Sequence, residues 1–237
     1  MRKLLLATVV ALAWFGAVVT QANAKPAEEV LRTWYQLVLE LVRHTPTYSP
    51  PVASRSFAYL GVTAFEAAAT GSGEMRSLVG QLNGLTPAPQ REAGKTYDES
   101  VVLQAAMAFA VQNFFENTGP TGQRAVASLE AKLRSEATAG LPADVAVRSE
   151  EYGRAVAEHV LTWSRDDGGA VIVNMGFPLE YELTMGPANW VPTNVIAQQQ
   201  KPLLPNWGKN RTFAMPNGAS CGLPAPPEYS EDKTSQF

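Results

Sequence analysis

The sequence has few of the residues that form disulfides and metal sites. One cysteine, Cys221, and two histidines occur among its 237 residues. A single cysteine forms no intrachain disulfide, and one Cys with two His does not complete the four-ligand Cys/His set of a structural zinc site. The sequence also lacks a glycine-rich phosphate loop that ends in Lys-Ser or Lys-Thr. We therefore assign no metal ligand, and the sequence gives Cys221 no role.

Charge is also scarce, and long hydrophobic runs are limited to the N-terminus. Charged residues make up 17% of the chain and hydrophobic residues 46%, which is typical of a globular protein. The apolar run from Leu4 to Val19 follows Met1-Arg2-Lys3 and precedes Ala22-Asn23-Ala24. This order indicates a secretory signal peptide over residues 1–24, because the run is shorter than the ~20 residues of a membrane span. An uncleaved membrane anchor is the alternative.

The signal peptide predicts an exported protein, in the periplasm or outside the cell. Loss of residues 1–24 removes Arg2 and Lys3, so the formal charge goes from −3 to −5. A negative chain argues against nucleic acid and against anionic membrane surfaces as partners.

From residue 25 to residue 167 the apolar residues recur mainly at helical spacing. We expect one helical domain over 25–167 and an all-α fold, a bundle of about five main helices. The expected helices lie at about 27–43, 50–70, 98–117, 121–139 and 143–165, with a short helical piece at 75–82.

The second of these helices carries two stripes. Gly61 lies within the apolar stripe, and because glycine destabilises a helix interior by roughly 1 kcal/mol, it suggests close approach of another helix. A second stripe places Arg55 and Glu66 where they either pair with a neighbouring helix or face a cavity. Together with His44 and Tyr48, they are our candidates for a cavity edge. The alternatives are a structural ion pair for Arg55 and Glu66 and a helix-closing hydrogen bond for His44.

Residues 168–237 have a different character. They contain nine prolines together with Trp190 and Trp207. Disordered segments are poor in aromatic residues, so we predict an ordered, irregular segment that wraps on the bundle and partly on protein outside this sequence. Ser230-Glu231-Asp232 is typical of a helix start, which leads us to expect that the natural chain continues past Phe237.

The stretch from His44 to Ala67 reads His-Thr-Pro-x-Tyr-Ser-Pro-Pro-Val-Ala-Ser-Arg-x-Phe-Ala-Tyr-Leu-Gly-Val-Thr-x-Phe-Glu-Ala. It resembles the N-terminal half of bacterial vanadium-dependent haloperoxidase-like proteins, which belong to the type 2 phosphatidic acid phosphatase superfamily. The resemblance runs from about Val30 to the last residue. It implies that the full protein binds vanadate and oxidises halide with peroxide, or hydrolyses a phosphoester.

The anion-binding motifs of that family are Lys-x6-Arg-Pro, Pro-Ser-Gly-His and Ser-Arg-x5-His, and none occurs in this sequence. Ser54-Arg55 has Gly61 in place of the histidine, and Ser164-Arg165 has Val171 there. The resemblance therefore assigns no catalytic and no cofactor-binding residue to this chain. It implies that the partner of this chain is a missing C-terminal catalytic half, which carries the vanadate. It also implies that the present chain alone is inactive.

Three further interpretations remain open from the sequence. The chain could be a stand-alone extracytoplasmic helical binding or interaction module, and it could form a homodimer. Gly218-Ala219-Ser220-Cys221-Gly222 fits the Gly-x-Ser-x-Gly nucleophile pattern, but the prolines around it do not suit the strand and helix which that motif requires.

Overall fold

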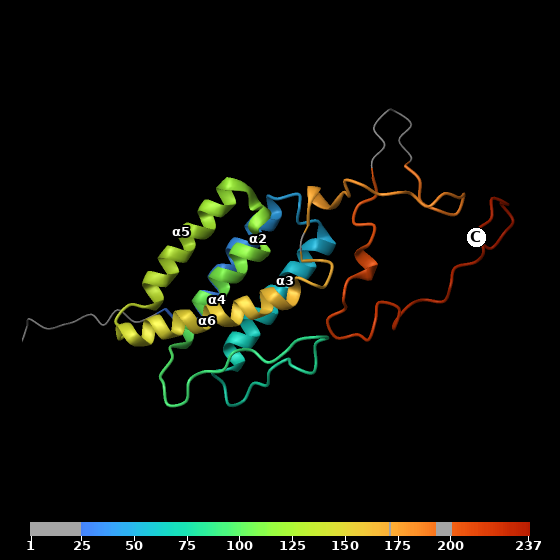
Figure 1. Cartoon of the computed structure of the whole chain (residues 1–237). Helices are drawn as coiled ribbons and strands as arrows, with labels where there is room; N and C mark the ends of the chain where they lie inside the picture. Colours follow the sequence, from blue (N-terminus) through green and yellow to red (C-terminus); the bar gives the residue numbers. More distant parts are fainter. Residues whose placement is uncertain (1–24, 171, 193–200) are drawn as a thin grey trace, which may run out of the picture.

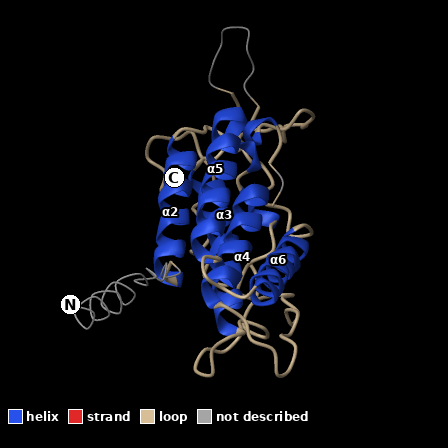
Figure 2. Ribbon diagram, turned by 90° about the vertical axis from the view of Figure 1, so that its left-hand side faces the viewer, coloured by secondary structure: helices blue, strands red, loops and turns tan. Residues whose placement is uncertain are grey.

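The computed structural model describes residues 25–170, 172–192 and 201–237, so the predicted signal peptide lies outside the described residues. Five α-helices occur among these described residues: α2 (Ala27–Arg43), α3 (Pro50–Ala69), α4 (Glu99–Phe114), α5 (Gly119–Ala137) and α6 (Ala143–Ser164). The same residues also form three short 3-10 helices: η1 (Glu116–Thr118), η2 (Asn174–Gly176) and η3 (Trp207–Lys209). The part of the chain that is described contains no strand, which confirms the predicted all-α bundle (Figures 1 and 2).

Helix α4 is the centre of the bundle. It contacts α2, α3, α5 and α6, and it is apolar on nearly every side, as a helix surrounded by others must be. Val102, Ala106 and Val111 are among its fully buried residues. The one polar side chain deep on this helix, Gln104, accepts a 2.7 Å hydrogen bond from the indole of Trp34 on α2, so its burial is compensated.

The glycine that lets two helices meet is Gly153 rather than Gly61. A Cβ at Gly153 on α6 would lie 2.1 Å from the carbonyl oxygen of Val102 on α4. A Cβ at Gly61 would meet nothing closer than the Tyr35 hydroxyl at 3.9 Å, which is ordinary contact. The close approach expected at Gly61 is therefore wrong, and the tight crossing lies between α4 and α6.

The short helix predicted over residues 75–82 is also wrong. The carboxylate of Glu66 accepts hydrogen bonds from the Leu78 backbone N–H at 2.7 Å and from the Ser77 hydroxyl at 2.8 Å. Gly80 then has φ +78°, a left-handed value that ends helical geometry. The backbone here is held by a buried side chain of α3 and forms turns instead.

Two helix starts show how local sequence acts. Asp98 caps α4, since its carboxylate accepts a 3.0 Å bond from the Val101 N–H. Ser49 occupies the corresponding place before α3, but its hydroxyl is buried without a partner. Pro50 and Pro51 start that helix instead.

The segment after α6 only partly wraps the bundle. Trp207 and Phe213 pack against the core, whereas the predicted anchor Trp190 is half-exposed. In Figure 1 the last residues run away from the helices. None of the helices described is both long enough and apolar enough to span a membrane.

Candidate functional site

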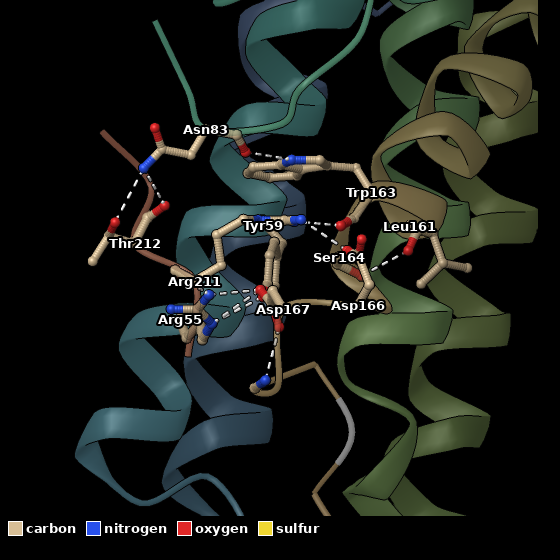
Figure 3. Close-up of polar contacts among 11 residues, drawn as sticks. Arg55, Tyr59, Asn83, Leu161, Trp163, Ser164, Asp166, Asp167, Arg211 and Thr212 are labelled. Atoms are coloured by element: carbon tan, nitrogen blue, oxygen red, sulfur yellow. Dashed lines mark hydrogen bonds and ion pairs between the residues drawn. The ribbon is translucent and has the colours of Figure 1, made fainter. Parts of the chain in front are cut away.

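A buried ion pair lies where the segment after α6 returns to the bundle (Figure 3). The Arg55 guanidinium on α3 donates from Nη2 and Nε to Asp167 Oδ2 at 2.6 and 3.1 Å. Nε also donates to the Tyr59 hydroxyl at 2.9 Å. The Asp167 side chain is 1% exposed and that of Arg55 is 13% exposed. The pair is thus shielded from solvent. Removing one partner would leave the other charge buried and uncompensated.

A second arginine continues this cluster. The Arg211 backbone N–H donates to the Asp167 carbonyl at 2.9 Å, and its guanidinium donates to Asp166 at 2.8 Å and to the Trp163 carbonyl. In turn, Arg55 Nη2 donates to the Arg211 carbonyl at 2.6 Å. The two arginines therefore fasten residue 211 to the end of α6 and to α3.

Aromatic rings fill the space between these charges. Phe213 lies 5.4 Å from both Tyr59 and Trp163, centroid to centroid. The Arg55 guanidinium lies 4.9 Å from the Phe213 ring, and that of Arg211 lies 4.9 Å from Trp163. Both are cation–π contacts, which gain strength where water is excluded.

Asn83 closes the cluster from the loop after α3. Its side-chain amide donates to the carbonyls of Thr212 at 2.9 Å and Met215 at 2.7 Å, and its backbone N–H donates to the Phe213 carbonyl at 2.7 Å. Its own carbonyl accepts from the Trp163 indole at 3.0 Å. Residues 211–215 are thus bound on three sides, by α3, by the end of α6 and by the 74–97 loop.

This arrangement suits anchoring better than anion binding. An oxyanion site needs several cationic and backbone donors aimed at one empty position. Here Arg55 is paired with Asp167 and Arg211 with Asp166, so each positive charge is matched by a carboxylate of the chain. The cluster therefore fixes a polypeptide segment and does not fit vanadate.

The four residues predicted at a cavity edge lie in separate surroundings. The His44 side chain is 71% exposed, 3.4 Å from Glu40. Tyr48 is buried against Phe115, and its hydroxyl accepts from the Asn117 N–H at 3.2 Å. Burial raises the pKa of the Tyr48 phenol well above its ordinary value.

Arg55 and Glu66 do not pair with each other. Arg55 pairs with Asp167, at the end of a neighbouring helix, and Glu66 is buried beneath the 77–78 backbone. In the structure Arg55 therefore contacts residues that the sequence did not single out. The cavity-edge role of the four residues stays a prediction.

A hollow of about 260 Å³ lies elsewhere, between α4, α5 and α6. Phe109 and the Arg134–Glu150 ion pair are among the residues that line it. Arg154 lies over the Phe109 ring at 4.9 Å. No group of three or more His, Cys, Asp or Glu residues that could hold a metal occurs among the residues described.

Ser220, in the Gly-x-Ser-x-Gly match, lies in an exposed turn. Its hydroxyl contacts Asn217, both at the backbone N–H and at the side-chain oxygen. The turn has neither a strand before it nor a helix after it, so the geometry of a nucleophile elbow is not formed there.

Sequence reasoning missed Asp167, Arg211 and Asn83 as members of the Arg55 cluster. Asp167 is separated from Arg55 by 112 residues, and it lies beyond the last apolar residue of α6. A charged Asp-Asp pair directly after a helix and an arginine among aromatic residues were the available signals, but neither indicates its partner.

Comparison with solved structures places this chain near a bacterial peroxidase. Neither a protein-family model nor a curated protein matches the chain. The crystal structure of a bacterial vanadium-dependent iodoperoxidase is similar over 90% of this chain, with 28% sequence identity and a TM-score of 0.63. The match covers 47% of that protein, so this chain spans about half its length. The chain therefore has a vanadium haloperoxidase-like fold.

Proposed function

We propose that this chain is the exported helical scaffold of a vanadium haloperoxidase-like or acid-phosphatase-like enzyme, and that the groups binding vanadate or phosphate lie in a further part of the protein. The observation that carries the proposal is the likeness to the bacterial iodoperoxidase, which covers 90% of this chain but 47% of that one.

Two features of this chain agree with a divided enzyme. The sequence contains none of the three anion-binding motifs of the resembled family. Arg55 and Arg211, the two arginines of the cluster, are each paired with an aspartate. We therefore expect vanadate, which would bind and activate peroxide, to be held by the partner half.

The role of this chain in the enzyme would be structural support. Helices α3 and α6 form a rigid support, and the Arg55 cluster fixes residues 211–215 upon it. The N-terminal signal peptide predicted over residues 1–24 would carry the enzyme to the periplasm or the cell exterior.

The test is to follow the natural reading frame past Phe237 and to assay its full product with vanadate. We expect Lys-x6-Arg-Pro, Pro-Ser-Gly-His and Ser-Arg-x5-His in the frame. We also expect either peroxide-dependent halide oxidation or phosphoester hydrolysis by the product. A natural stop at residue 237, with activity in the 237-residue protein, would overturn the proposal.

The second candidate is a stand-alone extracytoplasmic binding module. The hollow between α4, α5 and α6 favours it, since about 260 Å³ beside Phe109 and charged side chains can hold a small ligand. A natural stop at residue 237, a stable inactive monomer and saturable ligand binding would support this candidate.

A further inference from the structure

Apolar side chains are exposed on one part of the molecule far more than on the rest. Among the described residues, eleven of the fourteen large hydrophobic side chains that are exposed follow residue 172. The helices before that point expose only isolated ones, such as Leu39 and Val147, which is ordinary for a monomer surface. The concentration after residue 172 makes this segment the candidate contact surface of the described residues.

The best-defined part of this surface is formed by residues 172–179 and 201–207, which we call the apolar hook. Its two strips lie side by side, because the Leu204 N–H donates to the Gly176 carbonyl at 2.8 Å. They are also closely packed, since a Cβ at Gly176 would lie 2.9 Å from Leu204 Cδ2 and 3.0 Å from Leu203 Cδ1. The hook is thus a defined structure in which the two segments contact each other.

The backbone of the hook is strained at three residues other than glycine. Asn174, Met175 and Leu204 have φ values of +48°, +55° and +50°. Left-handed φ costs of the order of 1–3 kcal/mol at residues such as Met175 and Leu204, and less at an asparagine; such residues cluster at ligand clamps and switch regions. At Met175 the cost is not offset by burial, because the side chain is 50% exposed. A partner that covers Met175 would supply the missing contact.

The surface of the hook is apolar and hollowed. A hollow of about 160 Å³ lies among Phe177, Leu204 and Trp207, and a second of about 370 Å³ lies beside Phe177 and Leu179. Lys201 is the only charged residue in the two strips, and its ammonium group donates to the Leu179 carbonyl. Such a surface fits apolar side chains of a folded polypeptide rather than a nucleic acid or an anionic membrane, both of which require exposed cations.

We infer that the apolar hook is the surface on which the rest of the haloperoxidase-like enzyme docks onto the helical scaffold. The inference rests on the proposed function. The similar iodoperoxidase has more than half of its chain beyond the match, so a protein surface of the required size is expected. The hook is also continuous with the Arg55 cluster, because its second strip leads within a few residues to Arg211, which is bound to Asp167.

The experiment compares Leu179→Glu and Met175→Glu in two proteins, the full product of the reading frame and the 237-residue chain. Both side chains are exposed in this chain, so neither substitution should change its melting temperature. In the full product each should lower the melting temperature by a few degrees, which is roughly what one lost interface contact costs. Leu39→Glu and Val147→Glu are matched controls, since these side chains are 58% and 53% exposed on the bundle, and they should change neither protein.

Hydrogen exchange gives the second readout. Amides of residues 172–179 and 201–207 should exchange more slowly in the full product than in the 237-residue chain. Unchanged exchange and unchanged melting in a full product that carries the anion motifs would overturn the docking surface but leave the proposed function intact. A frame without those motifs would overturn both. Dimerisation of the 237-residue chain that Leu179→Glu abolishes would assign the hook to a second copy and contradict the inference.

Discussion

At the scale of single residues, solvent exposure decides what a charge contributes. Arg55 and Arg32 each lie close to one carboxylate, Arg55 at 2.6 Å from Asp167 and Arg32 at 2.5 Å from Glu28. The first pair is buried, whereas the side chains of the second are 64% and 78% exposed. Similar distances therefore predict very different energies.

We predict that Arg55→Met lowers the free energy of unfolding by about 3–5 kcal/mol, because Asp167 is left buried without its counter-charge. Arg32→Met is the control and should change it by less than about 1 kcal/mol. Urea unfolding followed by tryptophan fluorescence measures both. Equal effects of the two substitutions would show that the Arg55 cluster is not a structural anchor.

Because Tyr48 is buried, we predict a loss of stability in alkaline solution. Burial raises the pKa of its phenol in the folded state above the ordinary value of about 10. The neutral phenol is therefore favoured by folding. Its contribution is complete below about pH 10 and is lost as the pH rises further.

Tyr48→Phe should reduce this loss, since phenylalanine does not ionise. At about pH 8, below the ordinary pKa of a phenol, the variant should be slightly less stable, because it lacks the hydroxyl that accepts a hydrogen bond from Asn117. Between about pH 9 and about pH 11, around that ordinary pKa, its free energy of unfolding should fall less than that of the unchanged protein. Urea unfolding across that range is the measurement. An identical fall in both proteins would contradict the role of burial.

At the scale of the helices, two glycines give opposite predictions. Gly153→Ala places a methyl group 2.1 Å from the Val102 carbonyl oxygen, so α4 and α6 must separate. We expect a loss of about 1–3 kcal/mol or more from overpacking. Gly61→Ala meets only the Tyr35 hydroxyl at 3.9 Å, and alanine's helix propensity should add up to about 1 kcal/mol of stability. Thermal unfolding distinguishes them, and a stabilising Gly153→Ala would refute the tight crossing.

The helices could be predicted from the sequence because their signals are local. Pro50 and Pro51, Asp98, and the glycine-proline turns between helices mark ends that agree with the structure within a few residues. The 75–82 segment failed because Glu66, a residue of another element, captures its backbone N–H groups. Local sequence does not contain that competitor.

The Arg55 cluster was only half predictable for the same reason. Arg55 and Glu66 are the two charged residues of α3, and the sequence indicated that they either pair with a neighbouring helix or face a cavity. Asp167 and Arg211 lie 112 and 156 residues further along the chain, and their pairing depends on the way α6 packs against α3. The sequence thus located one end of the interaction and not the other.

At the scale of the whole molecule, the chain combines a well-packed bundle with a segment that exposes apolar side chains. The bundle encloses its core around α4, and Trp207 and Phe213 of the later segment pack against that core. The segment after α6 is anchored at residues 211–215 and presents the apolar hook to one side. This division suits a scaffold that holds another part of the protein in place.

On this proposal the groups that bind the anion lie outside these 237 residues. Calorimetric titration of the purified 237-residue protein with vanadate examines this without the rest of the enzyme. We predict no heat of binding beyond dilution, because Arg55 and Arg211 are already paired with Asp167 and Asp166. Saturable binding of one vanadate per chain would show that this chain carries an anion site of its own.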